Sequence, residues 1–334
     1  MILVTGGTGL VGSHLLYFLV KENERVRAIH RENSDITSVK KVFALYTSEV
    51  DSLFNKIEWF QASITDIPAL SVAFRDISKV YHCAAIISFD PSKYKILKKI
   101  NVEGTANIVN LCLTQDVEKL CYVSSVATLG SNIDDQLISE ESPWNPDEKN
   151  NVYAITKYAA EMEVWRGSQE GLKVVIVNPG VILGSGPKDG GSGVIISLAA
   201  NGIPFYPFGA MGIVDVQDVA KAMVQLMDSE IHNEQFILVG ENITYKSLLS
   251  KLAKLFGNKP PTIKLSKRIM LFVSGMDWLI NLIFKTERKI IKANVKSMFA
   301  ISLYDSNKIK NAINFHYTST QQTLERIVKE KRKN

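Results

Sequence analysis

Hydrophobic and polar positions follow two alternating patterns along the first 240 residues. Short runs of β-branched and aliphatic residues recur, and each is followed by a stretch whose apolar residues are three and four positions apart. The first pattern predicts buried strands and the second predicts amphipathic helices. The predicted strands start at residue 2 and continue at 25–29, 57–60, 79–85, 120–125 and 173–178. This rhythm predicts an α/β fold, a Rossmann doubly wound parallel sheet with helices on both faces.

The intervening and later segments complete this picture. Helices are predicted after the first strand and at 36–53, from Asp66, at 94–114, at 153–169 and at 217–227. A strand at 235–239 is expected to return to the main sheet, and the chain from residue 245 is mainly helical. We therefore expect a Rossmann dinucleotide-binding domain over 1–178 that 214–240 completes. A smaller, mostly helical substrate-binding domain would cover 179–213 and 241–334.

The first predicted strand runs directly into a glycine-rich turn, Thr5-Gly6-Gly7-Thr8-Gly9-Leu10-Val11-Gly12. Glycines permit a tight strand-to-helix turn and let the backbone approach a pyrophosphate, while the helix N-terminus offers unpaired N–H groups. A glycine-rich turn without a ligand is the simpler alternative. The turn lies between a strand pattern and a helix pattern, however, and this context favours a dinucleotide site.

A second motif carries candidate chemistry. Tyr153 and Lys157 are four residues apart on a predicted helix and therefore share one face. A nearby ammonium favours the phenolate and lowers the tyrosine pKa, so that the phenol can exchange a proton with a substrate oxygen. Ser124 and Ser125 end the fifth predicted strand, where ligands bind in such sheets. A Tyr/Lys pair alone is typical of an ordinary helix surface, but here it follows a dinucleotide turn and a strand-end serine pair in order.

With these motifs, the chain resembles an extended short-chain dehydrogenase/reductase of the NAD-dependent epimerase/dehydratase superfamily. The most similar branch holds dihydroflavonol reductases, 3β-hydroxysteroid dehydrogenases and nucleotide-sugar epimerases. The resemblance rests on residues 5–12, Asp66, His82-Cys83-Ala84-Ala85, Asn101–Asn107, Val123-Ser124-Ser125, Tyr153-x-x-x-Lys157, Asn178–Gly184, Val214–Ala220 and Tyr304–Lys308.

The resemblance implies a role for individual residues. Tyr153 would be the acid–base residue, Lys157 would lower its pKa and bind the nicotinamide ribose, and Ser125 rather than Ser124 would orient the substrate. Asp66 and Ile67 would hold the adenine, Ala84 and Ala85 would line the adenosine side, and the segment after Pro179 would touch the carboxamide. The cofactor residues implied are Thr5, Gly6, Gly9, Leu10, Val11, Gly12, Asp66, Ile67, Ala84, Ala85, Lys157, Pro179 and Val181.

The end of the second predicted strand bears on the choice of cofactor. NAD-binding proteins usually place an acidic residue there for the ribose 2′-hydroxyl, whereas an arginine accommodates a 2′-phosphate. Here the strand ends in His30-Arg31, and the first acidic residue is Glu32. Arg31 offers a bidentate phosphate fork, so we favour NADP (NADPH) over NAD. A solvated Arg31 paired with Glu32 is the alternative.

Three functions are compatible with these motifs. The favoured one is NADPH-dependent reduction of a carbonyl, or the reverse alcohol oxidation, by hydride transfer. A nucleotide-sugar epimerase or dehydratase with retained NAD is the alternative, although the chain lacks the tyrosine that many sugar epimerases carry before the glycine at Gly130. A non-catalytic dinucleotide-binding regulator would be expected to have lost the Tyr153/Lys157 pair.

Composition indicates which binding partners and which cellular compartment to expect. The formal net charge is +5, and the basic run at 329–333 has no interleaved aromatic residues, so we expect no nucleic-acid partner. The three cysteines lack metal-ligand spacing, and we expect no metal site. With a first strand that starts at residue 2, we expect no signal peptide and a cytoplasmic protein.

The apolar segment 269–284 is too short for a membrane span and is interrupted by Asp277 and Asn281. We expect a buried or lid helix there rather than membrane contact. Basic residues flank both of its ends, which leaves an interfacial helix as the alternative.

The substrate pocket is expected around Phe89, 133–137, 190–196, 205–208 and the helices after Ser266. These segments contain aromatic residues (Phe89, Phe205, Tyr206, Phe208 and Trp278) and few arginines, which favours an apolar carbonyl substrate over a diphosphate sugar. A homodimer through the helices at 94–114 and 153–169 follows from the resemblance.

Overall fold

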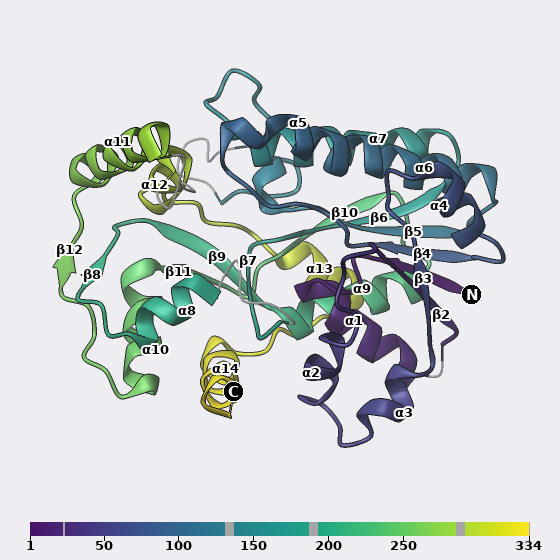
Figure 1. The fold of residues 1–334 in the computed structure, drawn as a ribbon, viewed down its shortest axis with the longest axis horizontal. Helices are drawn as coiled ribbons and strands as arrows, with labels where there is room; N and C mark the ends of the chain where they lie inside the picture. Colours follow the sequence, from purple (N-terminus) through teal and green to yellow (C-terminus); the bar gives the residue numbers. More distant parts are fainter. Residues whose placement is uncertain (23, 131–136, 187–192, 285–290, 334) are drawn as a thin grey trace.

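A computed structural model describes the chain except residues 23, 131–136, 187–192, 285–290 and 334. Its largest element is a seven-stranded sheet in the order β10-β6-β5-β4-β1-β2-β3, and every neighbouring pair is parallel (Figure 1). The strands are β1 (Ile2–Thr5), β2 (Val26–His30), β3 (Ile57–Gln61), β4 (Lys79–His82), β5 (Lys119–Val123), β6 (Lys173–Pro179) and β10 (Glu234–Leu238). The predicted Rossmann sheet is confirmed, including the returning strand at its edge.

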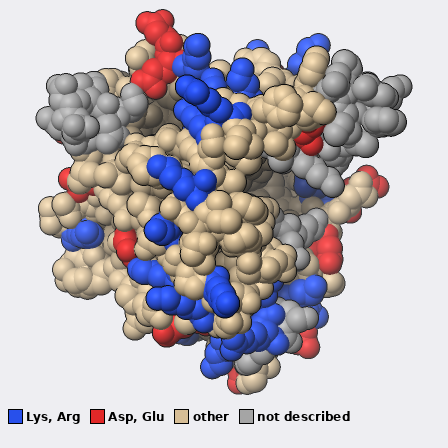
Figure 2. All heavy atoms as spheres, turned by 90° about the vertical axis from the view of Figure 1, so that its left-hand side faces the viewer, with Lys and Arg blue, Asp and Glu red and all other residues tan. Residues whose placement is uncertain are grey.

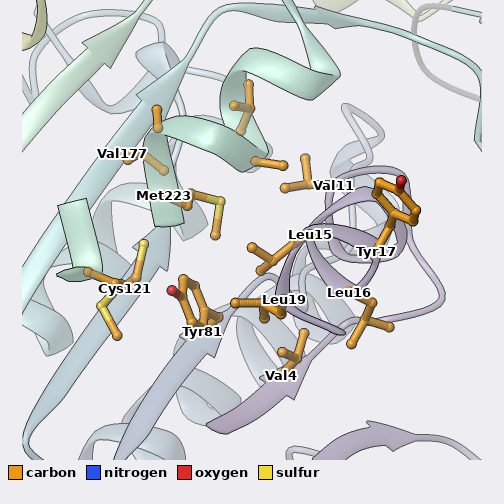
Figure 3. Packing of buried hydrophobic residues seen from close by; sticks show 14 of the residues in the cluster. Val4, Val11, Leu15, Leu16, Tyr17, Leu19, Tyr81, Cys121, Val177 and Met223 are labelled. Carbon is orange, nitrogen blue, oxygen red and sulfur yellow. The ribbon is translucent and has the colours of Figure 1, made fainter. Parts of the chain in front are cut away.

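Helices cover both faces of this sheet. On one face, α1 (Leu10–Lys21) packs against α9 (Val216–Asp228), and Leu15, Met223, Tyr81 and Cys121 meet in the core between them and the sheet (Figure 3). The other face is covered by α4 (Ile67–Ala73), α6 (Gly104–Thr114) and α7 (Val152–Gln169). Strands buried on both sides explain why their sequences are continuous apolar runs.

Two predicted helices differ in detail. The segment predicted as one helix at 36–53 forms two short helices, α2 (Val39–Phe43) and α3 (Val50–Phe54). Between them the Thr47 side chain accepts a hydrogen bond from the backbone N–H of Glu49, a local bond that competes with helical ones. The predicted helix at 94–114 is formed by α5 (Tyr94–Leu97), a π-helical turn η2 (Lys98–Glu103) and α6 in succession.

Residues after β6 also build elements that the sequence analysis missed. A small sheet has the order β11-β9-β7, with β7 at Val181–Leu183, β9 at Ala210–Asp215 and β11 at Glu241–Thr244. A two-stranded ribbon pairs β8 (Phe205–Tyr206) with β12 (Ile263–Lys264). The helices of this part are α8 (Gly193–Ala200), α10 (Tyr245–Phe256), α11 (Lys267–Phe284), α12 (Lys292–Met298), α13 (Asn307–Ile313) and α14 (Thr320–Lys333).

The two proposed domains are in contact with each other, for example through the hydrogen bonds of Asp215 with Thr323 and Arg326. Ile309 of α13 and Phe315, which lie in the range assigned to the substrate domain, pack into the core with α1 and α9. Across the described ranges, none of the helices combines the length and the apolar character that crossing a bilayer requires.

Candidate active site

The glycine-rich turn lies against the end of β4. Gly6 has a positive φ of 69°, and a Cβ atom on it would lie 2.7 Å from the backbone nitrogen of Ala84. A Cβ atom on Gly12 would lie 2.2 Å from the carbonyl oxygen of Gly6. Both positions therefore require glycine, because a side chain there would separate the turn from helix α1 or from β4.

The N-terminus of α1 offers backbone N–H groups to a ligand. Gly9 is its N-cap, and no side chain caps the helix. In contrast, the side chains of Asn151 and Asp215 cap α7 and α9. Uncapped N–H groups beside a close glycine backbone form an anion site, which fits the pyrophosphate of a dinucleotide.

Thr5, which the sequence analysis assigned to the cofactor, is fully buried. Its Oγ1 atom lies 2.6 Å from Nδ1 of His82 and accepts a hydrogen bond of 3.1 Å from the backbone N–H of Ala84. Burial lowers the pKa of His82 to about 3. The Thr5 hydroxyl therefore joins β1 to the end of β4 and so supports the turn from beneath.

A pocket of about 470 Å³ lies at the carboxyl ends of β2 and β3. It brings together the two charged residues that the sequence analysis assigned to the adenosine side, Arg31 and Asp66. The Asp66 carboxylate caps α4 by accepting a hydrogen bond from Ala69 N–H, and in the described part of the chain Arg31 forms no salt bridge. The pocket is lined by Arg31, Glu32, Asn33, Gln61, Ala62, Ser63 and Asp66.

Tyr153 lies in the first turn of α7, near the carboxyl end of β5. The Ser125 side chain is near enough to lower the pKa of its phenol, and its ring meets the ring of Phe89 edge to face at 5.6 Å between centroids. Burial raises the pKa of the Tyr153 phenol, and the Ser125 side chain partly offsets this rise. The geometry brings together the predicted tyrosine and the second serine of the pair.

Lys157 lies one turn further along α7 and is 1% exposed. Its Nζ atom donates hydrogen bonds to the hydroxyl of Tyr122 at 2.5 Å and to the carbonyl oxygen of Val123 at 2.8 Å. Burial lowers the pKa of Lys157 to about 7, although the nearby Glu161 and Cys83 groups act in the opposite direction.

This arrangement differs from the expected electrostatic effect of Lys157 on Tyr153. The charge of Lys157 is not among the causes that shift the tyrosine pKa, which burial raises instead of lowering. The Lys157 amine, whose own pKa is lowered to about 7 by burial, bonds instead to the hydroxyl of Tyr122 and to a backbone carbonyl of β5.

The buried carboxylate of Glu161 accepts a hydrogen bond from Ser124. The sequence did not lead us to expect this contact. The Oε2 atom of Glu161 accepts hydrogen bonds from Ser124 at 2.5 Å, Thr128 at 2.8 Å and Asn178 at 3.0 Å. Ser124 is therefore bound within the interior, whereas Ser125 faces Tyr153. The signal was present in the sequence, because Glu161 lies four residues after Lys157 and thus on the same helix face.

Asn101 belongs to one of the motifs that carry the family resemblance, and its side chain has a definite position in the structure. It is 1% exposed in the π-helical turn η2, and its side chain forms hydrogen bonds with both backbone groups of Ile86 and with the Thr156 hydroxyl. Asn101 thus ties the loop after β4 to α7, one residue from Lys157.

The other predicted residues are dispersed around this edge. Ala84 and Ala85 follow β4, Ile67 is exposed at the start of α4, Pro179 ends β6 and Val181 begins β7. Of the expected pocket segments, residues 133–136 and 190–192 lie outside the described residues. The exposed aromatic side chains among the rest are Phe205, Phe208, Phe272 and Trp278.

Comparison with known proteins assigns the family. The model of the NAD dependent epimerase/dehydratase family matches residues 2–240. Sterol demethylase protein B of Methylococcus capsulatus is 29% identical over 274 residues, which cover 80% of this chain and 78% of that protein. Tetraketide alpha-pyrone reductase 2 of Arabidopsis thaliana is 26% identical over 280 residues, which cover 80% of this chain and 86% of that protein.

A solved structure agrees with these sequence relatives. The crystal structure of gox2253 superposes with a TM-score of 0.81 at 27% identity, and covers 100% of this chain and 98% of that chain. The turn, the Tyr/Lys helix and the strand-end serine therefore lie on a known scaffold for NAD(P)-dependent chemistry. The chain belongs to the NAD-dependent epimerase/dehydratase family of extended short-chain dehydrogenases/reductases, and it is an NAD(P)-dependent enzyme.

Proposed function

We propose that the protein is an NADPH-dependent reductase of a carbonyl compound, or catalyses the reverse alcohol oxidation. The observation that carries this proposal is a Ser125 side chain near enough to the Tyr153 phenol to lower its pKa, at the end of β5 and one helical turn from the buried Lys157. A phenol and a hydroxyl side by side can bind one substrate oxygen from two directions.

When bound, the dinucleotide supplies the hydride. The chain's own residues then handle the oxygen: Ser125 holds it by a hydrogen bond, and Tyr153 donates a proton to it in reduction. A phenol whose pKa is raised by burial is protonated at neutral pH and thus ready to act as the acid. Lys157 has two of its three ammonium donors on β5, which fixes the amine beneath this site.

The preference for NADPH rests on the pocket that contains Arg31. A guanidinium without a salt-bridge partner among the described residues matches the charge of a 2′-phosphate. We expect Arg31→Ala to lose affinity for NADPH while its affinity for NADH changes little. Arg75→Ala, at an exposed arginine outside the pocket, is the control. Equal losses with both cofactors would refute the assignment.

The substrate is proposed to be apolar. Phe89 packs directly against the Tyr153 ring, so an apolar side chain borders the predicted acid–base residue. The names of the two relatives, a sterol demethylase protein and a tetraketide alpha-pyrone reductase, are compatible with carbonyl chemistry on apolar compounds.

The test is oxidation of NADPH and NADH across a panel of aldehydes, ketones and nucleotide sugars. We expect turnover with apolar carbonyls, and we expect Tyr153→Phe to abolish it with nearly unchanged cofactor binding, because only the proton carrier is lost. Tyr158→Phe, on the same helix, keeps its stacking on Trp144 and should remain active. Full activity of Tyr153→Phe would refute the catalytic role. Interconversion of nucleotide sugars without net NADPH use would favour the epimerase alternative.

A further inference from the structure

Several of the apolar side chains that the structure describes in helix α11 are exposed to solvent. Ile269, Phe272, Val273 and Met276 follow the spacing of one helical stripe, and they are 62%, 70%, 37% and 44% exposed. Of the other described side chains, Ser274 is 2% exposed and Asp277 is partly buried, whereas Trp278, on the side opposite Ile269, is 51% exposed. A surface helix of a globular protein normally shows the reverse arrangement, so this stripe (the α11 stripe) is built to contact something apolar outside the subunit.

The surroundings extend this surface. In the chain's fold α11 packs against α12 and lies at one end of the molecule, beyond the β8–β12 ribbon (Figure 1). Phe205 and Ile263 are register partners across that ribbon, and both are about half exposed, as is Phe208 in the next turn. Several large apolar side chains therefore reach solvent at the same end of the molecule.

The charge of this part of the chain is strongly basic. Residues 245–300 contain 12 Lys and Arg but 2 Asp and Glu, a formal charge of +10, against +5 for the whole chain. The remainder of the chain is therefore net acidic. Lys and Arg side chains extend across the face that contains these elements (Figure 2). The exposed basic residues on and around α11 and α12 are Lys259, Lys264, Lys267, Arg268, Lys292 and Lys296.

We propose that the α11 stripe and its basic surroundings form a docking surface for an anionic lipid bilayer. The helix would lie in the interface with its apolar stripe among the acyl chains, while the lysines and arginines bind acidic head groups. The surplus of basic charge selects this occupant, because a second copy of the chain would bring the same positive charge to the contact. This inference concerns attachment and goes beyond the proposed reductase function.

The experiment is sedimentation of the full chain with vesicles. We expect binding to phosphatidylcholine vesicles that contain about one-quarter phosphatidylserine and much weaker binding to pure phosphatidylcholine. Binding should also decline as salt rises from about 0.05 to about 0.5 M, since salt screens the head-group attraction. Phe272→Glu should lower the partition coefficient at least about tenfold, because it removes an apolar contact and puts a charge in the interface. Val72→Glu, at an exposed apolar position of α4, is the matched control and should bind as the parent does.

A second variant tests the same surface without disrupting it. Phe272→Trp places an indole in the stripe, and vesicles with brominated acyl chains should quench its fluorescence beyond the quenching seen in the parent protein. NADPH binding is measured for each variant, and retained binding shows that the variant is folded. A loss of vesicle binding with retained NADPH binding is thereby distinguished from damage to the catalytic site.

Three results would overturn the proposal. The first is no binding of the parent protein to acidic vesicles, and the second is equal binding by Phe272→Glu. The third is a dimer that Phe272→Glu converts to a monomer while vesicle binding is absent, which would assign the stripe to a second copy of the chain.

Discussion

The buried amine of Lys157 leads to a prediction about stability. In the folded protein its pKa is about 7, compared with 10.5 for an ordinary lysine, because burial penalises the ammonium. The side chain is 1% exposed, so water screens this penalty little. Replacement by methionine removes the titrating group and keeps an unbranched apolar stem of similar volume.

Whether the free energy of unfolding rises or falls with pH depends on which state, folded or unfolded, holds the Lys157 proton. Below about pH 7 both the folded and the unfolded chain hold it, and the Lys157 contribution does not vary. Between pH 7 and 10.5 only the unfolded chain holds it, so this contribution to the free energy of unfolding rises with pH. The rise is about 1.4 kcal/mol per pH unit, or about 2–3 kcal/mol between about pH 7 and about pH 9.

The assay is urea unfolding of the cofactor-free parent and of Lys157→Met across this pH range. The difference in unfolding free energy between the two should grow with pH at about that slope. Lys173→Met, at an exposed lysine that begins β6, should give a difference that does not depend on pH. A pH-independent difference for Lys157→Met as well would show that the amine keeps its ordinary pKa in the folded protein, and the reasoning from burial would be wrong.

Two further predictions concern the neighbours of this group. Glu161→Gln removes the carboxylate that raises the Lys157 pKa, so in the same urea series the pH-dependent rise should begin below pH 7; an unchanged onset would mean that the two groups are not coupled. Gly12→Ala places a Cβ atom 2.2 Å from a backbone carbonyl oxygen of the glycine-rich turn, and should cost about 1–3 kcal/mol of stability and weaken NADPH binding measured by fluorescence. Gly275→Ala, which meets no atom within 4 Å, should leave NADPH binding intact, and similar losses in both variants would exclude the clash as the cause.

The strands of the sheet and their succession along the chain were predictable because their signals are local. Each central strand is buried by helices on both faces, and therefore appears in the sequence as an unbroken apolar run, as in β1 and β6. The break between α2 and α3 was missed because it depends on a Thr47 hydrogen bond rather than on periodicity. The short strands β7, β9 and β11 were missed because they follow glycine-rich segments without a clear alternation.

The candidate site was predictable in its residues and only partly in its contacts. Helical spacing placed Tyr153 and Lys157 on one face, and both residues lie in α7, one helical turn apart. Spacing could not indicate that the lysine amine meets Tyr122, or that Ser124 is held by Glu161. These contacts depend on which strand lies beneath the helix.

The sequence by itself therefore determined the order of strands and helices, the glycine turn and the residue types of the site, since steric and helical-spacing rules act over a few neighbouring positions. Only the tertiary structure decided the pKa directions of Tyr153 and Lys157, because desolvation depends on everything packed around a group. It also decided which face of α11 is exposed to solvent. The sequence predicts an apolar helix there, but which face is covered depends on elements distant in the chain, and these leave Ile269, Phe272 and Met276 exposed to solvent.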